Sequence, residues 1–122
     1  MLRLQIHVES RYLDDRSLPD EDKYVFAYTI TIRNHDTQAV QLLNRYWLIT
    51  DGNGKTTEVS GAGVVGQQPT IEPGSQYSYT SGAVLESPVG TMEGHYEMVC
   101  SNGARFKAPI DVFRLAMPKV VN

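Results

Sequence analysis

Three glycines near the middle of the chain have the spacing of a nucleotide-binding motif. Gly61, Gly63 and Gly66 form the pattern G-x-G-x-x-G. In a dinucleotide-binding fold such glycines follow a strand and open a helix, whose N-terminal amides hold a pyrophosphate. Pro69 and Pro73 fall where that helix would run, so the motif does not act in that way here. A glycine loop without a helix can still bind an anion through successive backbone N–H groups.

The same three glycines also have a purely structural interpretation. A β-bulge or a sharp crossover between two sheets needs backbone conformations that glycine adopts most easily. The segment from Gly61 to Gly66 contains no lysine or arginine, which would be needed to strengthen the binding of an anion. We therefore favour the crossover and expect any pyrophosphate or nucleotide to bind weakly at this segment.

No group of residues has the pattern of a catalytic or metal site. The acidic segment 14–23 lacks the regular ligand spacing of a calcium-binding loop. His95 lies between Glu93 and Glu97 on one face of an expected strand, where the three side chains could bind a cation. A solvated outer face explains that pattern equally simply, and we favour it because such faces are normally polar. We expect no enzymatic activity, no cofactor and no resident metal ion.

Alternation of apolar and polar residues predicts that strands position these groups. The cleanest strand runs from Tyr24 to Asn34. Its expected inward residues are Tyr24, Phe26, Tyr28, Ile30 and Ile32. Further strands are expected over residues 2–8, 40–50, 55–60, 76–86, 92–100 and 105–115. The last of them should place Phe106, Ala108, Ile110 and Val112 inward. Pro109 marks that strand as a sheet edge or the site of a bulge.

Turns rich in Gly, Pro and Asn separate these strands, and no window has helical periodicity. The sequence therefore predicts an all-β fold, an antiparallel β-sandwich like those of immunoglobulin and fibronectin type III domains. At 122 residues the chain has the size of one domain, which we place at residues 1–122. An exposed edge strand of such a sandwich could also support a homodimer.

The strand over residues 40–50 carries large apolar groups on both of its alternating sets. This pattern is typical of a central strand or of a face that a partner covers. Tyr46 and Trp47 are the candidate contacts for a protein partner, with Trp47 expected on an exposed face.

Composition narrows the class of partner and the compartment. A net charge of -3 and a pI near 5.5 argue against nucleic-acid binding. Cys100 is the only cysteine, so no intramolecular disulfide forms and a reducing compartment is expected. We find no signal peptide and no apolar run long enough to cross a membrane. The expected location is the cytoplasm, without membrane association.

The sequence resembles the bacterial ApaG family over most of its length and in the same order. The matching segments are Tyr24–Asn34, Gln41–Gly54, Gly61–Pro69, Tyr79–Gly82, Gly90–Met98 and Phe113–Leu115. This resemblance implies a fibronectin type III or immunoglobulin-like sandwich without an established enzymatic activity. It also implies connections with diadenosine tetraphosphate metabolism and with cobalt and magnesium tolerance. ApaG-like domains in eukaryotic proteins look like protein-recognition modules.

We therefore expect a non-enzymatic binding module of the ApaG type that mediates protein–protein interaction, with a partner still to be identified. The alternative is a protein that binds pyrophosphate or a nucleotide through the segment from Gly61 to Gly66. Such a protein would be connected with diadenosine tetraphosphate metabolism or with cobalt and magnesium homeostasis, as the resemblance implies.

Overall fold

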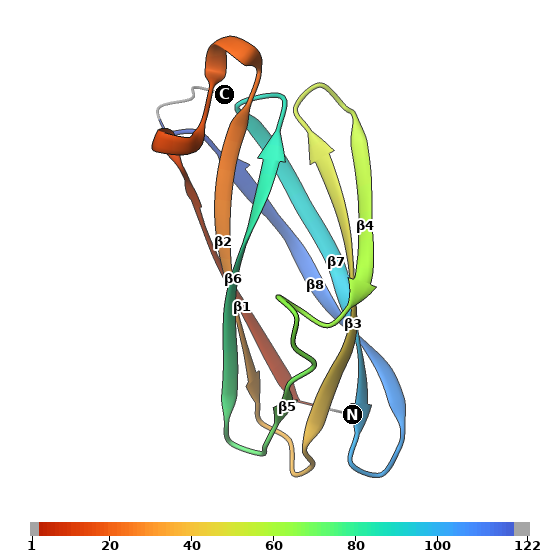
Figure 1. Ribbon diagram of the computed structural model, residues 1–122. Helices are drawn as coiled ribbons and strands as arrows, with labels where there is room; N and C mark the ends of the chain where they lie inside the picture. Colours follow the sequence, from red (N-terminus) through yellow and green to blue (C-terminus); the bar gives the residue numbers. More distant parts are fainter. Residues whose placement is uncertain (1–2, 119–122) are drawn as a thin grey trace.

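The computed structural model describes residues 3–118, which form a sandwich of two antiparallel β-sheets (Figure 1). The smaller sheet has the order β1 (Leu4–Tyr12), β2 (Tyr24–Asn34), β6 (Gln76–Leu85). The larger sheet has the order β4 (Thr56–Ala62), β3 (Val40–Asp51), β7 (Val89–Cys100), β8 (Arg105–Ala116). The short strand β5 (Thr70–Ile71) pairs with the start of β3. The predicted all-β sandwich is confirmed.

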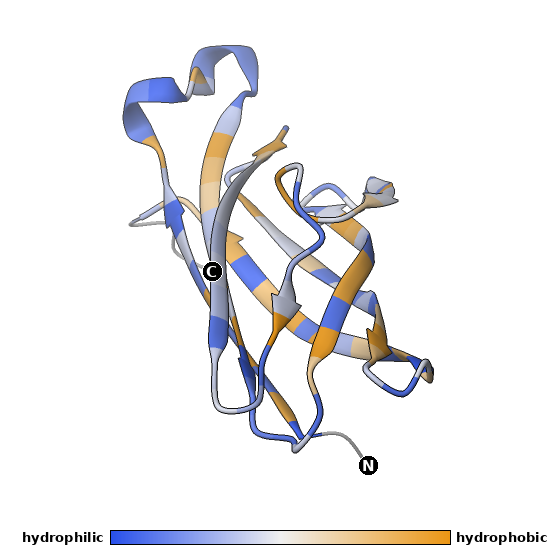
Figure 2. Ribbon diagram, turned by 60° about the horizontal axis from the view of Figure 1, so that its bottom comes forward, coloured by the Kyte–Doolittle hydropathy of each residue, from blue (hydrophilic) through white to orange (hydrophobic). Residues whose placement is uncertain are grey.

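Two short 3-10 helices interrupt the acidic connection between β1 and β2. They are η1 (Asp14–Arg16) and η2 (Pro19–Glu21), and neither contains a buried residue. In Figure 2 this connection is largely hydrophilic, whereas hydrophobic and hydrophilic residues alternate along the strands. Within residues 3–118, no helix is long and apolar enough to cross a membrane.

The alternation read from the sequence places the core correctly in β2. Phe26, Tyr28, Ile30 and Ile32 are buried, and Tyr24 at the start of the strand is half-buried. Their partners in the larger sheet include Trp47, Tyr96 and Leu115, which are all buried. The core therefore lies between the inner faces of the two sheets, as the pleat of a half-buried strand requires.

A β-bulge in β3 explains why both alternating sets of that strand are apolar. Leu42 lies opposite Met98 of β7, but Asn44 lies opposite Glu97, so Leu43 is an extra residue. An extra residue moves every following side chain to the other face. The inward set is therefore Val40 and Leu42 before the bulge, and Arg45, Trp47 and Ile49 after it.

A second irregularity lies between β7 and β8, and it overturns one predicted core residue. Met92 pairs with Phe113 and Gly94 pairs with Ile110, so β8 contains one extra residue between these pairs. Val112, expected to point inward, is 59% exposed. The inward positions beyond the bulge are those of Phe113 and Leu115 instead. Pro109 lies in a strand that is both a sheet edge and bulged.

The two sheets meet along two open sides. On one side the segment between β4 and β5 leaves the larger sheet, passes next to β6 of the smaller sheet and returns to pair with β3 (Figure 1). On the other side the edge strands β1 and β8 face each other without pairing. The first side holds the glycine motif, and the second holds an apolar groove.

Candidate functional site at the glycine loop

The glycine loop, residues 61–69, leaves β4 and ends just before β5. At its centre the amide of Val64 donates to the carbonyl oxygen of Gln67 at 2.8 Å, and the amide of Gln67 donates to that of Val64 at 2.9 Å. The two residues between them, Val65 and Gly66, have φ angles of 47° and 76°. Two central residues with positive φ define a type I′ turn. The loop is therefore a tight hairpin at the side of the sandwich.

A different structural feature favours glycine at each of the three motif positions. At Gly63, a Cβ would lie 2.2 Å from the carbonyl oxygen of Gln67, and φ is 65°. At Gly66, φ is 76° but no atom lies within 4 Å, so only the backbone conformation requires glycine. At Gly61, a Cβ would lie 3.1 Å from Nη1 of Arg45. All three lie in or next to a hairpin that leads from β4 back to β5 of the same sheet, so the expected crossover between two sheets is wrong. Their role in anion binding stays a prediction.

Arg45 of β3 is the residue of this site that the sequence analysis missed. Its Nη1 donates to the carbonyl oxygens of Gly63 at 2.9 Å and Ala62 at 3.2 Å. The bulge at Leu43 makes this possible, because it places Arg45 on the inward set of β3, opposite Gly61 of β4. We expected weak anion affinity because the glycine segment has no lysine or arginine of its own, and this reason is wrong. A cation does reach the glycine loop, but from a neighbouring strand.

The guanidinium of Arg45 also borders a pocket between the glycine loop and β6. The pocket has a volume of about 260 Å³ and is lined by Tyr28, Arg45, Val64, Val65, Gly66, Tyr79, Thr80 and Ser81. No carboxylate lines it. Among residues 3–118, Nε and Nη2 of Arg45 have no hydrogen-bond partner. These donors are free to bind an anion, for which the planar guanidinium is well suited.

Two tyrosines line the same pocket. Burial raises the pKa of Tyr28 above 10.0, while Ser81 and the positive charge of Arg45 partly lower it again. Burial also raises the pKa of Tyr79, whose hydroxyl is hydrogen-bonded to that of Tyr96 and whose pKa Arg45 again partly lowers. Both tyrosines in the pocket therefore stay protonated and uncharged at neutral pH.

The tip of the glycine loop adds backbone donors to this arrangement. The amides of Val65 and Gly66 have no acceptor within the part of the chain that the structure describes. Both residues are exposed, and Val65 is exposed by 62%. Successive amides at residues with positive φ are a common way to form a small anion-binding concavity.

The structure corrects the expectation that Trp47 lies on an exposed face. Its side chain is only 2% exposed. It makes edge-to-face contacts with the rings of Tyr28, Tyr96 and Phe113, at centroid distances between 5.5 and 6.4 Å. The bulge at Leu43 is the cause, because it turns Trp47 from the outer to the inner face. Trp47 is a core residue and cannot contact a partner in the folded domain.

Tyr46 lies half-buried on the outer face of the larger sheet, and its role as a protein contact stays a prediction. Its hydroxyl donates to Oε1 of Glu58 at 2.6 Å, and its ring stacks on His95 at 5.1 Å. Hydrogen bonding to Glu58 raises the pKa of Tyr46, with further contributions from burial and from Glu93. Tyr46 therefore belongs to a polar surface cluster, separate from Trp47.

His95 shares that outer face with Glu93 and Glu97. Oε1 of Glu97 accepts a hydrogen bond from the side-chain amide of Asn44 at 3.3 Å, while His95 stacks on Tyr46. Within residues 3–118, no group of three His, Cys, Asp or Glu side chains is close enough to hold a metal ion. The three side chains lie in one row along the strand face, but they do not converge on a single point.

A small all-β sandwich with a glycine-rich hairpin loop is the class of domain that these features define. The chain belongs to the ApaG family, because residues 14–100 match the ApaG domain. It is 57% identical to Protein ApaG of Pectobacterium atrosepticum and 59% identical to Protein ApaG of Proteus mirabilis, over 98% of this chain and 96% of each relative.

Solved structures agree with this assignment. A crystal structure of an ApaA protein from Bordetella pertussis is 46% identical to this chain and superimposes with a TM-score of 0.94. The superposition covers 98% of this chain and 97% of that protein. A protein from Archaeoglobus fulgidus shares the fold at 10% identity, with a TM-score of 0.53.

Proposed function

We propose that this ApaG-family protein is a non-enzymatic binding protein whose glycine loop takes a phosphate-type anion, either pyrophosphate or the phosphate chain of a nucleotide. The observation that carries the proposal is Arg45, which lies against the loop with donors left over for a ligand. The pocket beside it contains a cation and neutral hydroxyls without a carboxylate. That combination favours an anionic ligand over a neutral or cationic one.

The absence of a nucleophile–base pair at the pocket supports binding rather than catalysis. Tyr28, Tyr79 and Ser81 line the pocket together with Arg45, which is permanently protonated and cannot act as a base. Burial raises the pKa of Tyr28 and Tyr79, which makes these phenols poorer nucleophiles at neutral pH. A phosphate group held here would be bound and oriented, with no residue to activate an attacking water.

Calorimetric titration with pyrophosphate, ATP and diadenosine tetraphosphate tests this proposal. We expect binding that Arg45→Gln weakens roughly tenfold or more, because it removes charge-assisted hydrogen bonds. Arg105→Gln is the matched control, since Arg105 is exposed at the start of β8, outside the pocket. It removes the same charge and should leave the affinity unchanged.

Two results would count against phosphate binding. The first is the absence of heat at millimolar concentrations of all three ligands. The second is an equal loss of affinity in the Arg45 and Arg105 variants, which would indicate non-specific attraction to positive charge. The amide signals of Val65 and Gly66 in NMR spectra provide a second readout, because the bound anion should shift both.

We further infer that the sandwich is of the immunoglobulin and fibronectin type III kind and that the protein works in the cytoplasm. The first inference is supported by the division of strands, with β1, β2 and β6 in one sheet and the remaining strands in the other. The second is supported by Cys100, which is a free and buried thiol.

A role in protein recognition is the second candidate function. The burial of Trp47 removes the surface patch on which the sequence-based expectation rested. A different feature favours it, namely the apolar groove between β1 and β8. This groove lies on the side of the sandwich opposite the glycine loop.

A further inference from the structure

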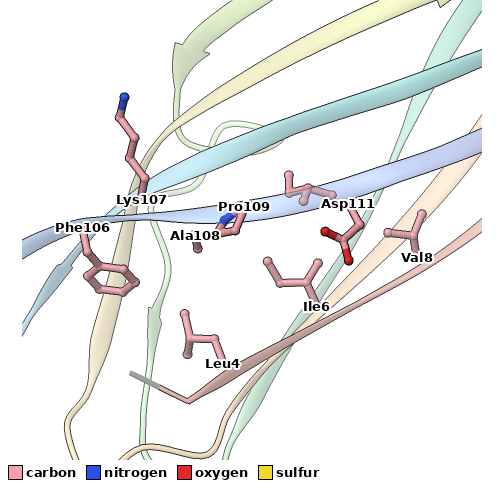
Figure 3. A pocket seen from close by; sticks show the side chains of 9 residues that line it. Leu4, Ile6, Val8, Phe106, Lys107, Ala108, Pro109 and Asp111 are labelled. Carbon is pink, nitrogen blue, oxygen red and sulfur yellow. The ribbon is translucent and has the colours of Figure 1, made fainter. Parts of the chain in front are cut away.

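The groove between β1 and β8 has an apolar floor and a volume of about 470 Å³. Leu4, Ile6 and Val8 of β1 point toward β8, and Phe106 of β8 points back toward β1 (Figure 3). The three β1 residues are only half-buried, although they face the core side of their strand. The groove therefore leaves apolar side chains partly open to solvent along five residues of an edge strand.

The backbone of β1 is also unpaired along this groove. The amide of His35 donates a hydrogen bond to the carbonyl oxygen of Arg3, and the amide of Leu13 donates to the carbonyl oxygen of Val25. Hydrogen-bonded positions alternate along an antiparallel pair, so in the β1–β2 register the odd-numbered residues bond to β2. The even-numbered residues, which include Leu4, Ile6 and Val8, turn their N–H and C=O groups toward the groove.

The opposite rim, β8, is a poorer template for another strand. The amide of Cys100 bonds to the carbonyl of Ala104. By the same alternation, the even-numbered residues Phe106 to Ile110 bond to β7. Pro109 therefore faces the groove edge and has no N–H to offer there. This is the usual position of proline in an edge strand.

The groove closes at one end and carries a negative charge there. Oγ of Ser10 donates to the carbonyl oxygen of Arg114 at 3.1 Å, which brings the two strands together. Just before this point, the extra residue in β8 turns the carboxylate of Asp111 toward β1 (Figure 3). Within residues 3–118, no cation lies within salt-bridge distance of Asp111.

We propose that the groove binds one extended peptide of a partner protein, which adds to β1 as an antiparallel strand. Its alternate apolar side chains would fill the space over Leu4 and Ile6, and a lysine or arginine near its N-terminal end would pair with Asp111. Strand addition of this kind takes affinity from backbone hydrogen bonds and specificity from the alternate side chains. The binding of phosphate at the glycine loop is not involved.

A single peptide fits this groove better than a second copy of the chain. Strands in a sheet lie about 4.8 Å apart, and a single peptide has only one strand to place against the free edge of β1. In a second copy, β1 is accompanied by its own β8 along the same edge. The two β8 strands would then compete for the space that the pairing strand requires.

The peptide Ac-Lys-Val-Thr-Val-Thr-Val-Ser-NH2 provides the probe, and amide hydrogen exchange followed by NMR provides the readout. At saturation we expect exchange at the amides of Leu4, Ile6 and Val8 to slow by about tenfold or more, because each gains a hydrogen bond. The amides of Gln5 and His7 already bond to β2 and serve as internal controls. Their exchange should change much less.

Asp111→Lys tests the charge pairing without disturbing the core, because Asp111 is exposed. It should weaken binding of the lysine peptide roughly threefold or more and favour a peptide with glutamate in place of lysine. Glu9→Lys is the matched control, since Glu9 lies on the outer face of the smaller sheet, beside His7. It changes the net charge equally and should not reverse the preference.

Three outcomes would overturn the proposal. The first is binding without protection at Leu4, Ile6 and Val8. The second is equal binding of a peptide whose alternate amides are N-methylated, which would mean that apolar contact alone suffices. The third is protection of the same amides that grows with protein concentration in the absence of peptide, which would assign the groove to a second copy.

Discussion

The hydroxyl oxygens of Tyr79 and Tyr96 lie 2.5 Å apart and form a hydrogen bond that joins the two sheets across the core. Tyr79 belongs to β6 of the smaller sheet, and Tyr96 belongs to β7 of the larger sheet. Both rings are buried. Neither hydroxyl can therefore be removed alone without leaving the other poorly satisfied in an apolar environment.

The first prediction concerns this pair. Tyr96→Phe should lower the free energy of unfolding by about 1–2 kcal/mol, because it leaves the Tyr79 hydroxyl without its partner. The double variant Tyr79→Phe/Tyr96→Phe should lose less than the sum of the single variants. Urea denaturation of all four proteins measures both quantities. Strictly additive losses would show that the hydrogen bond does not couple the two sheets.

The second prediction concerns alkaline pH. Burial raises the pKa of Tyr28, Tyr79 and Tyr96 above the ordinary value of 10.0. Above pH 10.0 the unfolded chain releases these protons while the folded chain keeps them, so the unfolded chain binds fewer protons and stability falls as pH rises. The stabilising contribution is complete below pH 10.0 and is lost toward the raised pKa values.

Urea midpoints at about pH 9, 10 and 11 check this dependence. The variant with phenylalanine at both Tyr79 and Tyr96 has lost two of the three ionisable groups. Its stability should therefore decline less steeply above pH 10.0 than that of the parent protein. Parallel declines in the two proteins would mean that other groups control alkaline unfolding.

The third prediction separates the glycines of the loop. Gly63→Ala should cost at least about 2 kcal/mol, because its Cβ would collide with the carbonyl of Gln67, at 2.2 Å. Gly66→Ala should cost about 1–2 kcal/mol, since only the left-handed conformation opposes it. Thermal or urea unfolding measures the difference. A larger loss at Gly66 than at Gly63 would contradict the proposed reasons for the two residues.

The fourth prediction concerns Val65, a β-branched residue with a φ angle of 47°. This conformation strains valine, and asparagine is preferred at the first central position of a type I′ turn. Val65→Asn should raise the free energy of unfolding by about 0.5–1 kcal/mol. Val84→Asn is a suitable control, because Val84 is also exposed but has no positive φ. Stabilisation by both changes would point to surface polarity and not to relief of strain.

The fifth prediction contrasts two neighbours on β3. Trp47→Ala should lower the free energy of unfolding by about 3–5 kcal/mol, because it empties the centre of an aromatic cluster. Tyr46→Ala should cost only about 1 kcal/mol, since it removes a surface hydrogen bond and a stacked ring. Urea denaturation distinguishes the two. Equal losses would mean that the outer face contributes as much as the core.

Alternation in the sequence predicted the strands and the core wherever the strands are regular. In β2 every expected inward residue from Phe26 to Ile32 is buried. Turn chemistry was equally informative, since Gly74 has a φ of 78° in the turn that Pro73 begins. These signals are local, because they depend on a residue and its nearest neighbours along the chain.

The two bulges could not be predicted from alternation along a single strand, and the candidate site depends on one of them. A bulge is set by the register between two strands, and β3 and β7 are far apart in the sequence. The bulge at Leu43 buries Trp47 and brings Arg45 to the glycine loop. The sequence did carry one indication, because both alternating sets of this strand contain large apolar residues. A bulge that moves the later side chains to the other face explains this pattern, and no covering partner is needed.

The pairing of β2 with β6 has a consequence for how the chain reaches its native state. The register joins Ile30 to Tyr79, so this sheet forms only after almost half of the chain has been brought round as a loop. Closing such a loop costs entropy before any contact repays it. Folding should accordingly take ~milliseconds to seconds, as in other sandwiches dominated by distant pairings. During synthesis β2 must wait for β6 to emerge, and one backbone edge of β2 stays unpaired until then.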